Sequence, residues 1–177
     1  LDPKKTYFSP RELTERQRIA SQVKKNEVVL VMFSGCGPCI IAIKKKQPTT
    51  KIYGIELNKE AHRYALENIR LNKLKDTVLM QGNVNKIMPS LREKFDRILM
   101  PLPKTAGQFL ELAFAKIKKN GVIHYYFWGK KEEYNDIKKM IREKALVYNQ
   151  QVKILNIQKV LPYAPRMHKL CVDIKVI

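Results

Sequence analysis

Acidic side chains are scarce in this chain of 177 residues. It contains 16 Asp and Glu against 35 Lys and Arg, which gives a formal net charge of +19 at pH 7. An excess of this size attracts polyanions and favours nucleic acid as the partner. The alternative is a solvated lysine-rich surface, as in proteins from hot environments, but such surfaces usually balance Lys with Glu.

Cysteine and long apolar runs are scarce too. Cys36, Cys39 and Cys171 are too few and too unevenly placed for a disulfide scaffold, so we expect a reducing, cytoplasmic location. No apolar run approaches the roughly 20 residues that span a bilayer, and no signal-peptide pattern is present. We therefore expect no membrane partner.

Length and composition favour one globular domain. Hydrophobic residues make up 45% and charged residues 29% of the chain, which is ordinary for a globular protein. We expect a single domain over residues 1–177, with a helical N-terminal segment over 1–27 and a core over 28–177, and we expect a monomer. Because Leu1 lies in what reads as a continuing segment, we expect the chain to be a C-terminal part of a longer protein.

Strand and helix patterns alternate along the chain. Ser9, Pro10 and Glu12 predict a capping box and a helix over 10–23, and the final segment alternates apolar and polar residues with a period of two. The order predicts an α/β fold with a mostly parallel sheet, helices on both faces and a C-terminal antiparallel hairpin. Strands are expected over 28–33, 51–57, 77–81, 95–100, 122–128, 152–161 and 168–177, and further helices over 38–46, from 58 onward, 109–119 and 131–148.

Two motifs at predicted strand ends point to a cofactor that contains adenosine. In the turn Phe33-Ser34-Gly35-Cys36-Gly37-Pro38, two glycines allow close backbone approach to a ligand, and the next helix offers free N–H groups. Ile40 stands where the dinucleotide fingerprint has its third glycine, which disfavours a nicotinamide cofactor. Glu56 ends the second strand about twenty residues after the glycines, where a carboxylate can accept both ribose hydroxyls. A plain glycine turn and a solvated Glu56 are the alternatives.

Two further motifs admit other interpretations. Met100-Pro101-Leu102-Pro103 ends the fourth strand; it leaves carbonyls free to face a substrate base, or it is simply a rigid loop. Cys36-Gly37-Pro38-Cys39 spells the thioredoxin motif, but the glycine-first turn and the long βα array favour a different fold. A zinc site is disfavoured because there is no second cysteine pair.

The residues resemble a known family over essentially the whole chain. Tyr7-Phe8-Ser9-Pro10-Arg11, Thr14-Glu15-Arg16, the glycine turn and Ile123-His124-Tyr125-Tyr126 are similar to the archaeal and eukaryotic tRNA (guanine37-N1)-methyltransferases. The resemblance implies a Rossmann-like class I methyltransferase fold. It implies S-adenosylmethionine as the cofactor, no metal, and transfer of its methyl group to N1 of guanosine 37 beside the anticodon of tRNA, with no DNA substrate.

The resemblance also implies roles for individual residues. Glu15 matches the proposed general base for the N1 proton, which must leave as the methyl arrives. Arg16 would hold O6 or a phosphate, and Pro103 would lie at the reacting base. Ordinary pairing on a helix face is the alternative for Glu15 and Arg16. The cofactor residues implied are Tyr7, Phe33, Ser34, Gly35, Cys36, Gly37, Glu56, Leu57, Asn83, Val84, Pro101 and Leu102; the RNA contacts expected are Arg11, Arg18, Lys104, Arg166 and His168.

Three positions depart from the family pattern and leave alternatives open. Val31 and Asn83 stand where the family usually has acidic residues, and Pro101 stands where it usually has Asn. The alternatives are transfer of a methyl or aminocarboxypropyl group to a wyosine-pathway guanine derivative in tRNA, and an RNA-binding domain with weak or no catalysis.

Overall fold

The computed structural model describes residues 6–102 and 106–177, and the chain divides into two compact units at Arg92 and Glu93. The first unit holds three parallel strands, β1 (Val28–Met32), β2 (Lys51–Glu56) and β3 (Thr77–Gln81). β2 pairs with both neighbours, so Met32 lies beside Ile55 and Glu56 beside Gln81. The carboxyl ends of the three strands therefore meet at one edge.

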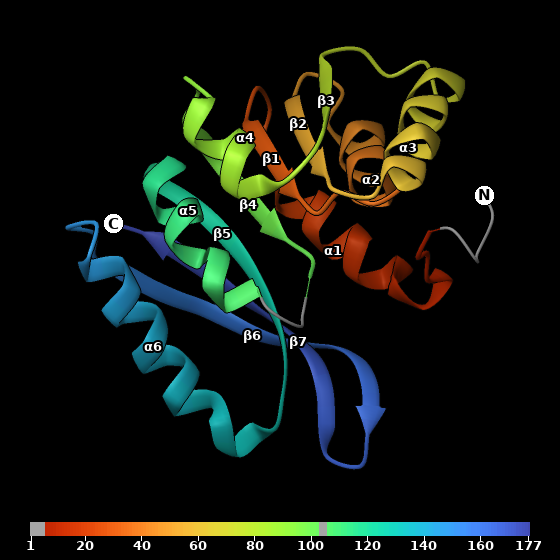
Figure 1. The fold of residues 1–177 in the computed structure, drawn as a ribbon. Helices are drawn as coiled ribbons and strands as arrows, with labels where there is room; N and C mark the ends of the chain where they lie inside the picture. Colours follow the sequence, from red (N-terminus) through yellow and green to blue (C-terminus); the bar gives the residue numbers. More distant parts are fainter. Residues whose placement is uncertain (1–5, 103–105) are drawn as a thin grey trace. The chain divides into compact units, whose positions relative to one another are not determined.

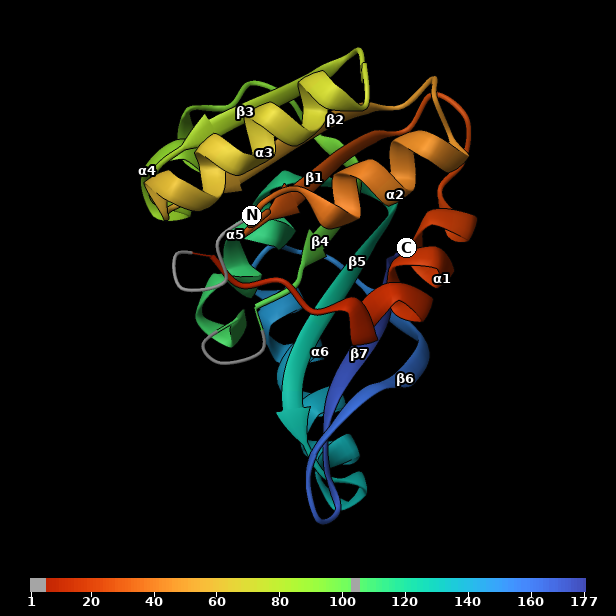
Figure 2. The same ribbon diagram turned by 90° about the vertical axis from the view of Figure 1, so that its right-hand side faces the viewer.

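Helices cover both faces of these strands. α2 (Pro38–Lys46) and α3 (Lys59–Leu71) lie on one face and α4 (Val84–Ser90) lies on the other (Figures 1 and 2). A short 3-10 turn η1 (Pro10–Glu12) leads into α1 (Leu13–Gln22), which packs beside α2. Close packing on β2 requires Gly54, because a Cβ there would lie 2.8 Å from the side chains of Ile40 and Leu79.

The second unit is built on two long antiparallel pairings. β4 (Phe95–Met100) runs parallel to β5 (Ile117–Gly129), β5 is antiparallel to β7 (Met167–Val176), and β7 is antiparallel to β6 (Val152–Ala164). α5 (Leu110–Lys116) and α6 (Tyr134–Leu146) lie side by side against this sheet (Figure 1). Two 3-10 turns, η2 (Ala106–Phe109) and η3 (Lys131–Glu133), precede these helices.

The predicted fold class is confirmed. The described residues form seven strands, mostly parallel, with helices around them and a C-terminal antiparallel hairpin. All seven predicted strands are present. Within the described residues, none of the helices is both long and apolar enough to cross a bilayer.

Three local predictions were wrong, and one helix was not predicted. The Ser9 side chain makes no capping hydrogen bond, so the predicted capping box does not form. The helix predicted over 109–119 ends at Lys116, because Ile117 already belongs to β5 and pairs beside Phe95. α4 was not predicted; it is a short helix that contains Pro89. β6 continues through the predicted turn to Ala164, so the hairpin turns at Pro165 and Arg166.

Candidate cofactor and substrate site

The loop after β1 has an alternating backbone conformation. Phe33, Gly35 and Gly37 all have positive φ, at 57°, 56° and 86°. Phe33 is a bulky residue in the left-handed region, a strained conformation that is found most often at functional sites. The Gly37 N–H donates to the Ser34 carbonyl at 3.0 Å, which closes the turn into α2. The N–H groups of the turn are used inside the protein, since the Ser34 N–H also donates to the Ile55 carbonyl at 2.9 Å and ties the loop to β2.

Glu56 is fixed against this loop by both of its carboxylate oxygens. Gly35 N–H donates to Oε2 at 2.7 Å, and Asn58 N–H donates to Oε1 at 2.8 Å. The side chain is half-buried at the last residue of β2. The structure thus brings Gly35 and Glu56 together, 21 positions apart in the chain, as the sequence predicted.

The helices α2 and α3 hold the loop in place. Asn68 Nδ2 on α3 donates to the Cys36 carbonyl at 2.9 Å. Gly37 packs against Ala65, where an added Cβ would lie 3.7 Å from the Ala65 Cβ. α3 itself is anchored beside Glu56, because the Asn58 side chain accepts hydrogen bonds from the N–H groups of its first turn.

The space beside Gly35 is open. A Cβ at Gly35 would meet no atom within 4 Å. Leu57, which follows Glu56, is 62% exposed although it is apolar. Asn83 is exposed, and its Oδ1 accepts from Asn85 N–H at 2.9 Å to cap α4, whereas Val84 is buried. Leu57 therefore offers an exposed apolar surface against which a ring system could pack.

Cys36 does not have the environment of a reactive thiol. It is 3% exposed, and burial raises the pKa of its thiol above the ordinary value. A thioredoxin-like cysteine requires a lowered pKa and partial exposure. The Cys-Gly-Pro-Cys spelling therefore belongs to the glycine turn and not to a redox site.

The predicted base on α1 is paired within its own helix. Glu15 is 7% exposed and accepts from Arg18 through both oxygens, at 2.7 Å from Nε and 2.8 Å from Nη2. This is the pairing on one helix face that the alternative interpretation allowed, with Arg18 as the partner. Arg18, expected to contact RNA, thus makes a bidentate ion pair with a buried carboxylate.

The segment before α1 packs on Arg16. The buried Arg16 guanidinium lies over the Phe8 ring, 5.2 Å from its centroid, and donates to the Ser9 carbonyl at 3.0 Å. Tyr7 is 71% exposed, and its hydroxyl donates to Glu12 at 3.3 Å. Arg11 is exposed. Phe8 and Arg16 also line an open groove of about 710 Å³ between α1 and α2.

The predicted target-base loop lies in the second unit. Pro101 and Leu102 are half-buried after β4, and Leu102 N–H donates to the Met100 carbonyl at 2.9 Å. Pro103 and Lys104, predicted to contact the base and the RNA, lie outside the described residues.

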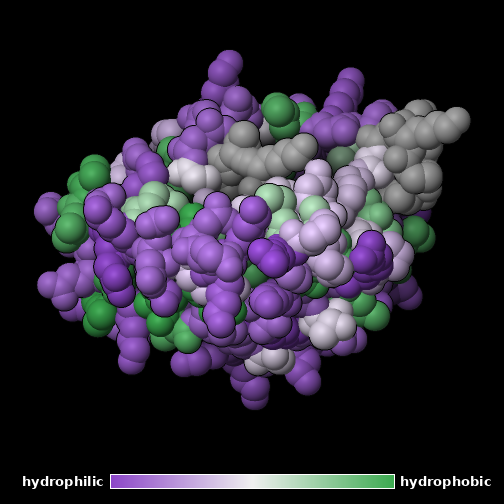
Figure 3. All heavy atoms as spheres, turned by 90° about the horizontal axis from the view of Figure 1, so that it is seen from below, coloured by the Kyte–Doolittle hydropathy of each residue, from purple (hydrophilic) through white to green (hydrophobic). Residues whose placement is uncertain are grey.

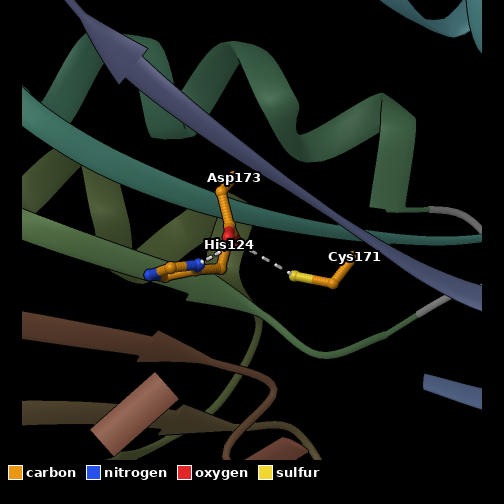
Figure 4. Close-up of side chains that lie close together, drawn as sticks. All are labelled: His124, Cys171 and Asp173. Carbon is orange, nitrogen blue, oxygen red and sulfur yellow. Dashed lines mark hydrogen bonds and ion pairs between the residues drawn. The ribbon is translucent and has the colours of Figure 1, made fainter. Parts of the chain in front are cut away.

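A buried polar network crosses the strands of the second unit, and the sequence did not predict it. His124 on β5 lies directly opposite Asp173 on β7, with its Nδ1 2.7 Å from Asp173 Oδ1. The Cys171 thiol donates to the same oxygen at 3.5 Å, so both side chains point at one carboxylate (Figure 4). Arg97 Nη1 lies 2.7 Å from His124 Nε2.

Hydrogen-bond chemistry assigns the protons of this network. A guanidinium can only donate, so His124 Nε2 accepts and Nδ1 carries the proton that is donated to Asp173. His124, Cys171 and Asp173 are also arranged as metal ligands could be. A cation there would lie beside the Arg97 guanidinium and would require Cys171 to lose its proton. We therefore interpret the cluster as a neutral His124 imidazole between the positive charge of Arg97 and the negative charge of Asp173, with no need for a metal ion.

The other two predicted RNA contacts meet at a second pocket. Arg166 and His168 line a pocket of about 380 Å³ together with Lys131, Lys159 and Tyr134. Figure 3 views the molecule from the side toward which the β6–β7 hairpin points in Figure 1, and most of that surface is hydrophilic. Basic side chains from η3, β6 and the β6–β7 hairpin line this pocket.

Comparison with known proteins identifies the family. The sequence profile of the TRM5/TYW2 methyltransferase domain matches residues 1–155. The chain belongs to this family. A tRNA (guanine(37)-N(1))-methyltransferase Trm5b of Pyrococcus abyssi is 39% identical over 177 residues, which cover 99% of this chain and 52% of that protein. The chain therefore spans about half the length of the curated relatives it matches first.

Solved structures of family members share the fold. The crystal structure of Pyrococcus abyssi Trm5b superimposes with a TM-score of 0.91 at 38% identity over 99% of this chain and 52% of that one. Methanocaldococcus jannaschii TYW2 in complex with AdoMet gives 0.90 at 30% identity over 99% of this chain and 80% of that one. A complex of aTrm5 and tRNALeu gives 0.81 at 36% identity, covering 98% and 48%. The resemblance predicted from the sequence is thus confirmed for this methyltransferase domain.

Proposed function

We propose that this methyltransferase domain binds S-adenosylmethionine at the carboxyl ends of β1 and β2 and methylates N1 of guanosine 37 in tRNA. The observation that carries the proposal is the Glu56 carboxylate, held by backbone N–H groups on both sides and facing the open turn at Gly35. A carboxylate that is already fixed can accept hydrogen bonds from hydroxyl groups without the loss of side-chain conformational entropy that a mobile carboxylate would incur on binding.

The residues present fit the cofactor. Each Glu56 oxygen accepts one backbone N–H hydrogen bond, and a carboxylate offers about four acceptor positions in total. The open side of Gly35 suits the methionine part, and exposed Leu57 suits the adenine face. When bound, S-adenosylmethionine supplies an activated methyl group, so the protein has to position it and manage one proton.

Glu15 and Arg16 are the proposed groups for that proton and the developing charge. Arg18 orients the Glu15 carboxylate with two hydrogen bonds, as a base needs an orienting partner. Arg16 is held by Phe8 and Ser9, so its charge is placed before RNA arrives. The net charge of +19 favours tRNA capture. The same proposal includes a cytoplasmic monomer, binding of the anticodon loop, and Tyr7 and Val84 as residues that line the cofactor site.

The first test is calorimetric titration with S-adenosylmethionine. We expect one-to-one binding that Glu56→Ala weakens by about tenfold or more, because charge-assisted hydrogen bonds are each worth about 1.5–3 kcal/mol. Glu60→Ala is the matched control: Glu60 lies four residues on, in the first turn of α3, and pairs with exposed Arg63. Equal affinity of the two variants would refute the site.

The second test identifies the group transferred. The family includes TYW2 as well as Trm5, and one relative is a tRNA(Phe) (4-demethylwyosine(37)-C(7)) aminocarboxypropyltransferase of Methanocaldococcus jannaschii, 32% identical to this chain. We expect a tRNA transcript with guanosine at position 37 to yield 1-methylguanosine by mass spectrometry. An aminocarboxypropyl nucleoside would overturn the methyl assignment, and cofactor binding without any product would favour the RNA-binding alternative. Glu15→Gln should lower turnover and leave cofactor affinity unchanged.

A further inference from the structure

A small pocket at the carboxyl end of β5 gathers basic side chains from three elements. Lys131 comes from η3, Lys159 from β6, and Arg166 and His168 from the β6–β7 hairpin. The pocket has a volume of about 380 Å³ and contains one acidic side chain, Glu132. It is therefore hollow, accessible and positively charged.

The basic side chains of the pocket lie close together because η3, β6 and the β6–β7 hairpin meet there, and not because ion pairs hold them. Within the described ranges 6–102 and 106–177, no hydrogen bond or salt bridge joins the side chain of Lys131, Lys159, Arg166 or His168 to another side chain. Elsewhere in this unit, by contrast, Lys118 pairs with Asp96 at 2.9 Å. Lys131, Lys159 and Arg166 outnumber the single Glu132 carboxylate in the pocket lining and repel one another, so the cluster gains stability when an anion enters.

The pocket walls suit a phosphate group. Burial, together with the Glu132 carboxylate, raises the pKa of the Tyr134 phenol, so its hydroxyl remains a donor at neutral pH. Gly129 lines the pocket on β5, directly opposite His168 on β7. Lys, Arg and hydroxyl donors around one hollow are the groups that contact phosphate oxygens in nucleic-acid complexes.

A neighbouring aromatic pair favours RNA over a free phosphate. The Tyr163 ring packs on Trp128 with centroids 4.5 Å apart, yet Tyr163 remains 61% exposed. Trp128 pairs with Lys169, and the next pair along the strands is Gly129 with His168. Because side chains of successive residues in a strand point to opposite faces, the rings and the pocket lie on opposite faces of the hairpin. An exposed ring on the other face of the hairpin that carries the basic pocket is a stacking surface for an unpaired base, which a free phosphate would not use.

We propose that this pocket binds a backbone phosphate of the RNA substrate, with Lys159 and Arg166 as its principal contacts. The inference rests on the proposed tRNA substrate and assigns it a docking point at the β6–β7 hairpin. These residues position the RNA and take no part in the transfer. Their loss should therefore raise KM for tRNA and leave kcat and cofactor affinity unchanged.

The test compares Lys159→Gln and Arg166→Gln with Lys119→Gln. Lys119 is exposed at the start of β5, roughly 30 Å along the strand from Gly129, and its variant loses the same charge. Binding of the tRNA transcript is measured by fluorescence anisotropy over a range of salt concentrations. We expect each pocket variant to bind about fivefold more weakly and the logarithmic salt slope to fall by about 1, with wild-type behaviour for the control.

The outcomes separate this inference from the proposed function. Equal affinities and slopes for pocket and control variants would overturn the pocket, whether or not the protein methylates tRNA. If wild type makes no methylated product, the proposed function fails, and the anisotropy titration still decides the pocket. Inorganic phosphate that competes with tRNA only in wild type would support the same site. Tighter binding of phosphate than of tRNA in the pocket would overturn the assignment to RNA.

Discussion

The buried network of the second unit leads to a prediction about stability. Asp173→Asn keeps the shape of the side chain but removes the negative charge that faces Arg97 through His124. Arg97, His124 and Asp173 are at most 3% exposed. Two contacts of 2.7 Å on either side of the imidazole ring place the opposite charges about 7–8 Å apart. Coulomb's law with an effective dielectric constant of about 20 then gives about 2 kcal/mol of attraction.

The expected loss is larger than the Coulomb attraction alone. Removal of one partner also leaves a buried guanidinium without its counter-charge, and such losses reach about 3–5 kcal/mol. We expect Asp173→Asn to lower the free energy of unfolding by about 2–4 kcal/mol. In a domain of this size each kcal/mol corresponds to roughly 2–4 °C, so Tm should fall by about 5–15 °C.

Asp96→Asn provides the matched comparison. Asp96 pairs with Lys118 at 2.9 Å, but the two side chains are 34% and 40% exposed. Solvent screening limits such a pair to about 1 kcal/mol or less. Thermal and urea unfolding of both variants, followed by circular dichroism, measure the difference. Equal losses for Asp173→Asn and Asp96→Asn would refute the assignment of a charge-linked network.

A double variant sharpens the test. Arg97→Met removes the charge that Asp173→Asn leaves uncompensated and retains a long apolar side chain. If the two charges interact through His124, the double variant should be more stable than the sum of the two single losses predicts. Additive losses would mean that each side chain acts alone.

Three further predictions concern the cofactor loop and the elements β2 and α2 beside it. Gly35→Ala should weaken S-adenosylmethionine binding more than tenfold, because the added methyl group would occupy the open space proposed for the cofactor. The variant should lose only about 1–2 kcal/mol of stability, because φ is +56° but no atom lies within 4 Å of the added methyl. Calorimetry measures the affinity and Tm the stability, and unchanged affinity would contradict the prediction. Gly54→Ala should lower the free energy of unfolding in urea by about 1–3 kcal/mol through overpacking against Ile40, and a neutral effect would show that β2 and α2 relax apart. In native protein at pH 8, iodoacetamide should label half-exposed Cys39 well before Cys36, because burial raises the Cys36 pKa and reduces its thiolate fraction; mass spectrometry checks the order, which should vanish in urea.

Strand order and the cofactor edge could be predicted because they follow from topology alone. Consecutive βα units place parallel strand ends side by side, so a glycine turn after one strand and a carboxylate after the next must approach each other. The contact of Gly35 with Glu56 confirms this. Helix ends were harder to predict, since several side-chain and backbone groups compete for the same hydrogen-bond partners there. Ser9 had the sequence of a capping residue, but its carbonyl and not its hydroxyl is used, by Arg16.

The polar network could not be predicted because it depends on register. Arg97, His124 and Asp173 each interrupt an apolar strand, and each could have been an outward-facing polar residue on an exposed sheet face. Only the antiparallel pairing of β5 with β7 sets His124 opposite Asp173, and a shift by one residue would turn them to opposite faces. A basic, a neutral and an acidic side chain in three apolar strands are nevertheless a signal. Burying any one alone is costly, so their joint presence in strands of a central sheet implies mutual contact. The same network then opposes slippage of β7, because every other register leaves a charge buried and unpaired. That requirement falls on the hairpin that carries Arg166 and His168, so the register that satisfies the network also sets which hairpin residues face the basic pocket.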